Sequence, residues 1–191
     1  PWNLRKITIG GCPELMFDGS REGFAGFISF EEVEEDDEEK GRCLLPQSLE
    51  HLDWSDYSRK ALRPCFVGNL TCLKKINLNS GRSLECLQLD SCTALEDLEI
   101  QGCDQLVTIE GLRSLGILRS LKLSYNSRLK SLQLHSCTSL ECLEIDDCSS
   151  LVTIEGLRSL VNLKNLKIVD SPALGSLISF DSYEPTERFP S

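Results

Sequence analysis

Several motifs that carry chemistry are missing from this 191-residue chain. It has two histidines, and its ten cysteines form no C-x-x-C pair, which argues against a zinc site. The G-x-G-x-x-G and G-x-x-x-x-G-K-[ST] loops, the H-E-x-x-H motif and the calcium pattern D-x-[DN]-x-[DN]-G are also absent. Neither His51 nor His135 belongs to a recognisable nucleophile motif. We therefore assign no catalytic residue, metal or cofactor and expect a protein that is not an enzyme.

Long hydrophobic runs are lacking as well. No stretch approaches the ~20 apolar residues of a membrane span. The chain opens on PWNLRKITI, inside a repeat, without an initiator Met or a signal peptide. We expect a monomeric piece of a longer protein, with residues 1–191 forming one domain and an irregular tail at about 178–191.

Charge is plentiful but concentrated. The formal net charge is -10, yet EEVEEDDEE at 31–39 holds eight carboxylates, and removing them leaves 22 acidic against 20 basic residues, or -2. The rest of the chain gives no electrostatic case for binding nucleic acid or a membrane. We interpret the acidic run as part of a solvated insertion loop at about 18–43, with capture of a basic partner as the alternative.

What the chain does contain is a repeat. The pattern L-x-x-[LI]-x-[LI] begins at Leu73, Leu95, Leu118, Leu140 and Leu163, in steps of 22, 23, 22 and 23 residues. This spacing is typical of leucine-rich repeats, and it predicts an α/β leucine-rich-repeat solenoid, a β-dominated horseshoe with a parallel concave sheet. We number the positions of each coil from its first leucine.

The repeat is doubled. LVTIEGLRSL occurs at 106–115 and again at 151–160, an offset of 45 residues, and LECLQLDSCTALEDLEIQGC at 84–103 returns as LKSLQLHSCTSLECLEIDDC at 129–148. Duplication of a pair of coils is the simplest explanation.

Apolar and polar residues alternate with period two, which predicts the inner strands. The side chains at positions one, four and six should then point into the core. On the outer side, Leu84/Leu87/Leu89 and Leu129/Leu132/Leu134 predict short strands. In 106–115 and 151–160 an apolar residue recurs every third position, a spacing typical of a helical turn. We therefore expect outer strands to alternate with helical turns from coil to coil. Earlier coils begin at Leu49, which makes Trp54 a core residue, and at Leu4. The interval between them holds one coil with a long insertion or, alternatively, a hidden irregular coil.

Half of the cysteines have a structural explanation. Cys12, Cys103 and Cys148 occupy the ninth coil position, where leucine-rich repeats place Asn or Cys, and Asn126 and Ser171 hold it in other coils. Cys92 and Cys137 take the equivalent place in the outer half-coils. We expect small buried groups and reduced thiols.

Charged side chains between the inner leucines form two rows whose signs alternate from strand to strand. The second position carries Lys74, Glu96, Arg119, Glu141 and Lys164, and the fifth carries Asn77, Glu99, Lys122, Glu144 and Lys167. Because parallel strands lie about 4.8 Å apart, these charges would neutralise one another. A structural charge ladder is our first interpretation, and direct contact with a partner protein is the second.

Two features depart from these rows as candidates for partner contact. Asp146 and Asp147 add an acidic patch to the coil that starts at Leu140. Tyr125 lies at the eighth position of the preceding coil, where an aromatic side chain either anchors a partner or covers the turn beside Asn126.

Four strings carry a family resemblance: GRCLLPQSLEHL at 41–52, LRPCFVGNLTCLKKI at 62–76, LQLHSCTSLECLEI at 132–145 and LVTIEGLRSL. Over roughly residues 41–175 the chain resembles the C-terminal leucine-rich repeats of grass nucleotide-binding immune receptors, especially the group with N-terminal BED zinc fingers. The resemblance implies a cytoplasmic receptor, with the nucleus as a second location, whose repeats detect a pathogen effector and help to hold its nucleotide-binding region inactive.

Two other function classes remain open. One is the substrate-recognition region of an F-box ubiquitin-ligase subunit, which can carry similar repeats. The other is a structural scaffold in which the charge rows serve stability alone.

Overall fold

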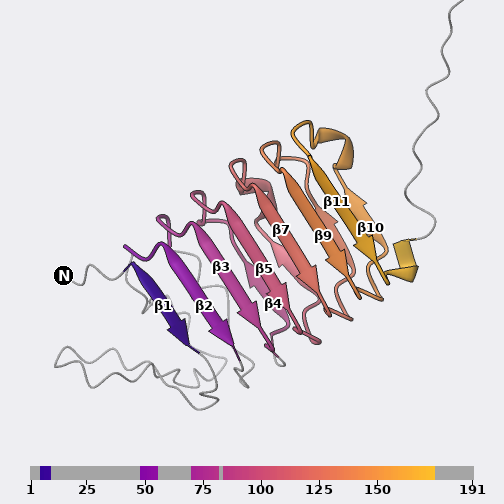
Figure 1. Ribbon diagram of the computed structural model, residues 1–191, viewed down its shortest axis with the longest axis horizontal. Helices are drawn as coiled ribbons and strands as arrows, with labels where there is room; N and C mark the ends of the chain where they lie inside the picture. Colours follow the sequence, from indigo (N-terminus) through magenta and orange to yellow (C-terminus); the bar gives the residue numbers. More distant parts are fainter. Residues whose placement is uncertain (1–4, 10–47, 56–69, 82–83, 175–191) are drawn as a thin grey trace, which may run out of the picture.

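The computed structural model describes residues 5–9, 48–55, 70–81 and 84–174, and it is built around a seven-stranded parallel sheet (Figure 1). Successive coils each contribute one strand, and neighbouring strands lie side by side in chain order. The strands of this sheet are β1 (Lys6–Ile9), β2 (His51–Ser55), β3 (Lys75–Asn79), β5 (Asp97–Gln101), β7 (Ser120–Ser124), β9 (Cys142–Asp146) and β11 (Asn165–Val169). The predicted β-dominated solenoid with a parallel sheet is confirmed.

The strands pair without any slip in register. Leu98 of β5 stands between Ile76 of β3 and Leu121 of β7, so each coil position meets the same position in the next coil. β1 and β2 follow the same rule, since Ile7 faces Leu52 and Ile9 faces Trp54. The coils predicted at Leu4 and Leu49 therefore supply strands to the same sheet.

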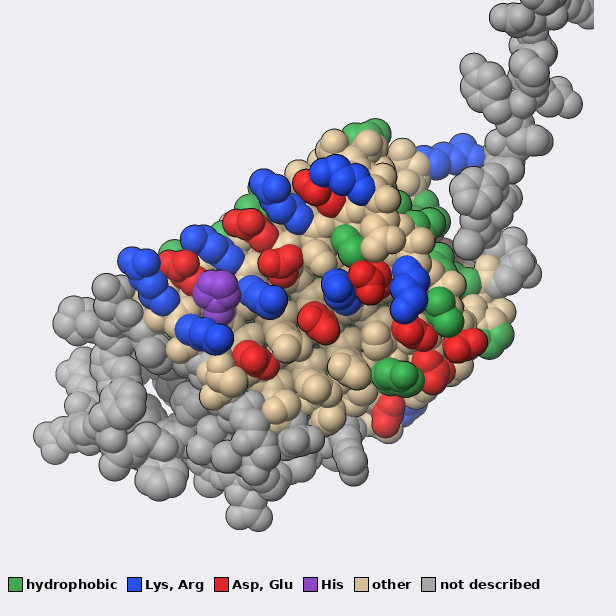
Figure 2. Space-filling view, viewed as in Figure 1, with side chains coloured by type: hydrophobic (Ala, Val, Ile, Leu, Met, Phe, Trp, Pro, Cys, Tyr) green, Lys and Arg blue, Asp and Glu red, His purple; other side chains and the backbone are tan. Residues whose placement is uncertain are grey.

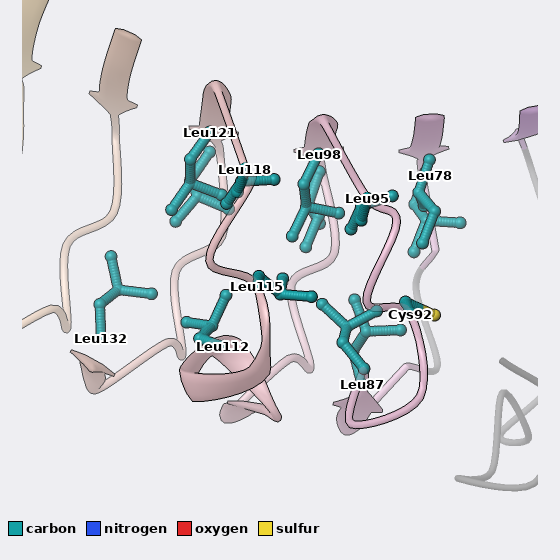
Figure 3. Packing of buried hydrophobic residues seen from close by; sticks show 14 of the residues in the cluster. Leu78, Leu87, Cys92, Leu95, Leu98, Leu112, Leu115, Leu118, Leu121 and Leu132 are labelled. Carbon is teal, nitrogen blue, oxygen red and sulfur yellow. The ribbon is translucent and has the colours of Figure 1, made fainter. Parts of the chain in front are cut away.

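The core is a set of leucine columns between this sheet and the outer side of the coils (Figure 3). Positions one, four and six are buried in the coils of β3, β5, β7 and β9, because each has a described coil on both sides. Trp54 is also buried, as its sixth position predicted. In the coil of β11 the fourth-position Leu166 is 43% exposed, whereas its equivalents Leu121 and Leu143 are 0% exposed.

The outer side contains strands in four successive coils, which corrects the expected alternation. β4 (Cys86–Gln88) pairs with β6 (Thr108–Glu110), and β8 (Ser131–Gln133) pairs with β10 (Thr153–Glu155). β6 and β10 lie where the sequence predicted the start of a helical turn. Short 3-10 helices η1 (Leu112–Ser114) and η2 (Leu157–Ser159) follow these two strands, and a third, η3 (Pro172–Leu174), follows β11.

A residue with a left-handed backbone follows each of the strands β3, β5, β7, β9 and β11 at the eighth coil position. Ser80, Gly102, Tyr125, Asp147 and Asp170 have φ between 46° and 65°. The N–H of this residue donates to the seventh-position carbonyl of the next coil, as from Tyr125 to Asp146 at 2.9 Å. The left-handed turn thus links each coil to its successor.

The ninth position fills the interior of this turn. Asn126 is fully buried, and its Nδ2 donates to the Ile100 carbonyl at 2.9 Å while its Oδ1 accepts from the Cys103 N–H at 3.1 Å. Cys103 and Cys148 are buried at the same position, and Cys92 and Cys137 are buried on the outer side. The prediction that these four cysteines are small buried groups is confirmed. Burial raises the pKa of the Cys137 thiol to about 11. Burial also raises the pKa of the Cys148 thiol, so these two sulfurs are neutral thiols at physiological pH.

Some expectations concern residues outside the described ranges. They are the insertion loop at 18–43, the tail at 178–191, and Cys12 at the ninth position of the first coil. In the part of the chain that the structure describes, no helix is long and apolar enough to cross a membrane.

Gly111 provides a test of the outer packing. It begins the η1 turn with φ of 81°, and a Cβ there would come within 2.7 Å of the Leu89 carbonyl carbon. Gly111→Ala should lower the free energy of unfolding by at least about 2 kcal/mol, because the clash adds to left-handed strain. Gly116→Ala is the matched control, since its Cβ would approach nothing closer than 3.8 Å. Equal urea-unfolding curves for both variants would contradict this packing.

Asn126 provides a second test. Asn126→Ala would leave the Cys103 N–H and the Ile100 carbonyl buried without partners, and we expect a loss of about 2–4 kcal/mol. Asn162→Ala removes an asparagine whose Nδ2 donates to Thr138 at the exposed surface, and it should cost far less. Thermal and urea unfolding of the two variants check this difference, and a small effect of Asn126→Ala would show that water replaces the amide.

Candidate functional site

The outward face of the seven-stranded sheet is the candidate site, and we call it the sheet face. In β2, β3, β5, β7 and β9 the fourth and sixth positions point into the core, so the third, fifth and seventh positions point outward. Figure 2 shows basic and acidic side chains alternating over this face, with a band of uncharged surface toward the ends of the middle strands. Charge and polarity therefore vary systematically across it.

The second coil position forms a chain of ion pairs at the start of the strands. Arg119 lies between two acids, with Nε 3.8 Å from Glu96 Oε2 and Nη1 3.6 Å from Glu141 Oε1. Glu141 Oε2 in turn accepts from Lys164 Nζ at 2.7 Å. Four of the five predicted second-position residues are thus joined across β5, β7, β9 and β11.

The same row continues toward the N-terminus through two residues that the sequence analysis did not name. Glu50 contacts Lys74 Nζ at 3.1 Å and Arg5 Nε at 3.6 Å. Both follow the first apolar residue of an early coil, so extending the repeat numbering backwards would have found them. Within the described residues no ion pair joins Lys74 to Glu96, and the row is interrupted there.

The fifth position is only partly paired. Lys122 Nζ lies 3.3 Å from Glu144 Oε1, as the alternating signs predict. Lys167, however, pairs with Asp146 at 3.4 Å rather than with Glu144 in its own row. Among the described residues Glu99 has no ion-pair partner, and Asn77 carries no charge. Asp146, expected to stand apart from the rows, is therefore part of the charge network.

These contacts shift the ionisation of the row. A hydrogen bond from Lys164 is the main cause that lowers the pKa of Glu141, and Lys74 does the same to the pKa of Glu50. The pKa of Glu144 is lowered first by a hydrogen bond from the Cys142 thiol and then by Lys122. The charged forms of Glu50, Glu141 and Glu144 are thus favoured by their partners in the ladder.

The seventh position supplies the uncharged band. Ser55, Asn79, Gln101 and Ser124 are adjacent in the register and half-buried, and Asp146 follows them. These four residues carry no charge and were not among the candidates predicted for partner contact. Four neighbouring polar residues at one coil position were the signal that could have revealed it.

Tyr125 borders this band at the end of β7. Its side chain is 51% exposed, although its backbone has φ of 56°, a conformation that costs a tyrosine about 1–2 kcal/mol relative to glycine. The preceding coil has Gly102 at the same position, and the next has Asp147, which is also exposed. Tyr125 is therefore held at the surface in a strained conformation, beside polar groups that can accept or donate hydrogen bonds.

The histidines and Cys142 lie on different elements of the described chain. No group of three or more His, Cys, Asp or Glu side chains in these ranges is arranged to hold a metal ion. His51 lies in β2 on the sheet, whereas His135 follows β8 on the outer side. Cys142 is half-buried on β9, where burial and Glu144 raise the pKa of its thiol.

Neither protein-family models nor curated proteins gave a match to this chain.

The ion-pair row predicts a specific response to acid. Because the pKa of Glu141 is lowered in the folded state, its stabilising contribution is present above its unfolded pKa and is lost as pH falls through the folded value. We expect Lys164→Met to raise the pKa of Glu141 and to flatten the fall in stability below about pH 5. NMR titration of the Glu141 carboxyl, with urea unfolding at each pH, measures both effects.

Lys130→Met is the matched control, because Lys130 is exposed and has no ion pair among the described residues. It should leave the Glu141 titration unchanged. Identical titration curves for wild type and Lys164→Met would show that the ladder is not formed in solution.

Proposed function

We propose that the sheet face is a protein-recognition surface and that this chain is the leucine-rich-repeat region of an intracellular plant immune receptor. The observation that carries the first part is Tyr125, an exposed aromatic side chain in a strained backbone beside an uncharged polar band. Strain at an exposed side chain indicates a function, because glycine would fit the same turn at lower cost. The resemblance over residues 41–175 supports the second part.

The chemistry of the face favours a protein partner. Tyrosine combines a large apolar area with a hydroxyl and often dominates binding energy at interfaces. Its polar neighbours, Gln101 and Ser124, offer hydrogen bonds without a net charge. The ion-paired rows lie beside this band and have no single dominant sign, so they supply complementarity rather than general attraction.

The proposed mechanism is differential contact. The sheet face would bind the receptor's own nucleotide-binding region in the resting state and a pathogen effector in the active state. An effector that binds the released coils more tightly shifts the population toward the active receptor. Such a chain acts by binding, without a cofactor and without catalysis, in the cytoplasm or the nucleus.

Tyr125→Gly separates binding from stability. Glycine removes the anchor and also relieves the left-handed strain, so the free energy of unfolding should stay equal or rise. Partner affinity should fall by about 30-fold or more, the ~2 kcal/mol expected of an interface hot spot. Affinity capture from infected and healthy plant tissue, followed by quantitative mass spectrometry, identifies the partner, and titration calorimetry then measures its affinity.

The controls distinguish the competing functions. Glu144→Lys and Lys167→Glu alter the sheet face and should reduce capture, whereas Lys130→Glu on the outer side should not. Equal losses on both faces would argue against a sheet-face interface. Capture of no partner by the wild type would favour a structural scaffold, and capture of ubiquitin-ligase components would favour the F-box alternative.

A further inference from the structure

The outer strands leave a gap between the two copies of the 45-residue repeat. β4 pairs with β6 in the first copy and β8 pairs with β10 in the second, but β6 and β8 do not pair, although they belong to successive coils. The first main-chain bond between successive outer strands is 2.9 Å long within each copy, from Val107 to Glu85 and from Val152 to Lys130. Between the copies, Lys130 donates to the Val107 carbonyl at 3.4 Å, and no further hydrogen bond joins β6 to β8 in the described chain.

Main-chain groups face one another across this gap. In a parallel ladder, alternate residues of a strand bond to opposite neighbours. The Glu110 carbonyl accepts from the coil of β4 at 3.0 Å, so the N–H and carbonyl of Ile109 point toward β8. Leu134 donates to the coil of β10 at 2.9 Å, so the main-chain groups of Ser131 and Gln133 point toward β6. These groups of Ile109, Ser131 and Gln133 have no hydrogen-bond partner among the described residues.

A cavity of about 270 Å³ occupies the gap. Ile109, Glu110 and Leu112 line it on the side of β6, and Ser131 and Gln133 line it on the side of β8. Both walls lie inside the continuous described range 84–174, with the coils of β4 and β10 on either side. The volume is below the ~300–1,000 Å³ of sites for drug-sized ligands, so the cavity suits one small group.

The lining favours a neutral group. Asp90 and Glu110 are acidic and Arg113 is basic, and the Glu110 carboxylate already accepts from Gln88 Nε2 at 2.9 Å. The main-chain groups in the gap include both donors and acceptors. An amide can satisfy both at once, whereas a carboxylate only accepts and a guanidinium only donates.

The inner side of the same chain shows how an amide fits between coils. Asn126 Nδ2 donates to the Ile100 carbonyl at 2.9 Å, and its Oδ1 accepts from the Cys103 N–H at 3.1 Å. One amide thus bonds a carbonyl and an N–H of the neighbouring coil. In the part of the chain that the structure describes, no side chain does the same between β6 and β8.

We propose that the gap between β6 and β8 binds an amide group of another protein, from an Asn or Gln side chain or from the main chain of an exposed loop. In a continuous ladder the Gln133 N–H would donate to the Ile109 carbonyl. The bound amide would bridge these two groups, accepting from Gln133 and donating to Ile109. This inference is independent of the proposed function, because it concerns the outer side of the coils rather than the sheet face.

Fragments of equal size test the proposal on the 191-residue chain. Propionamide is the probe, and the controls are 2-butanone, which lacks the N–H groups, and propionate, which is charged. We expect amide NMR titration to give a Kd on the order of 10 mM for propionamide, with shifts at Ile109, Ser131 and Gln133, and binding at least about tenfold weaker for both controls. N-methylpropionamide distinguishes the sources: tighter binding than propionamide assigns the site to main-chain amides, and weaker binding assigns it to Asn and Gln side chains.

Gln133 offers a matched pair of variants. Gln133→Ala keeps the main-chain N–H that faces the gap, whereas Gln133→Pro removes it without breaking a hydrogen bond between β8 and β10. We expect Gln133→Ala to bind propionamide as the wild type does and Gln133→Pro to bind it at least about tenfold more weakly. Equal affinity of the two variants would contradict the bridge at Gln133.

Hydrogen exchange in the wild type keeps the proposal testable even if Gln133→Pro does not fold. The Gln133 amide should exchange faster than the Leu134 amide, which donates to Glu155 at 2.9 Å, and propionamide should slow the exchange of Gln133. Equal protection of these two amides without the probe, absence of saturable shifts, or equal binding of propionamide and 2-butanone would overturn the proposal.

Discussion

The structure depends on one constraint: a single coil cannot bury its own leucines. Each coil of 22 or 23 residues contributes a short strand and a few apolar side chains. These side chains are buried from solvent only when the coils before and after both cover them. The contrast between Leu143, which is fully buried, and Leu166, which is 43% exposed, shows how much the next coil contributes. The apolar positions are therefore fixed by packing, and the outward positions remain free for charge, polarity and recognition.

The turn after each strand sets a second requirement, which explains where the surface is distinctive. The eighth residue must adopt a left-handed backbone so that its N–H reaches the next coil, and the ninth must be small or capable of bridging main-chain groups. Glycine and aspartate meet the first requirement at low cost, whereas Tyr125 does not. The fold accepts the strain at Tyr125 because the hydrogen bond to Asp146 and the buried Asn126 hold the turn in place.

The sequence predicted the inner sheet well because the same pattern occurs in every coil. Period-two alternation locates Leu98 and Leu121, and the constant coil length brings them into register. The outer side was less predictable, since the apolar spacing around Ile109 fits a helical turn as well as a short strand. β-branched Thr108 and Ile109 favour the strand that forms.

The charge rows were predictable in sign but not in partner. Alternating signs at the second position lead directly to the contacts of Arg119. Lys167, in contrast, reaches diagonally to Asp146, because a long side chain can contact more than the residue directly opposite it. The coil position of Tyr125 indicates a candidate contact residue, whereas nothing in the sequence around a tyrosine indicates a left-handed backbone.

The charge ladder also matches a repeat that is doubled in pairs of coils. The coil of β5 carries acids at its second and fifth positions, and the coil of β7 carries bases there. Duplicating both together places the basic β7 beside the acidic β9, which preserves the attraction that Arg119 makes with Glu141. Duplicating one coil would place like charges on adjacent strands about 4.8 Å apart, which destabilises the sheet. The 45-residue period is thus the shortest one that extends both the leucine columns and the charge ladder.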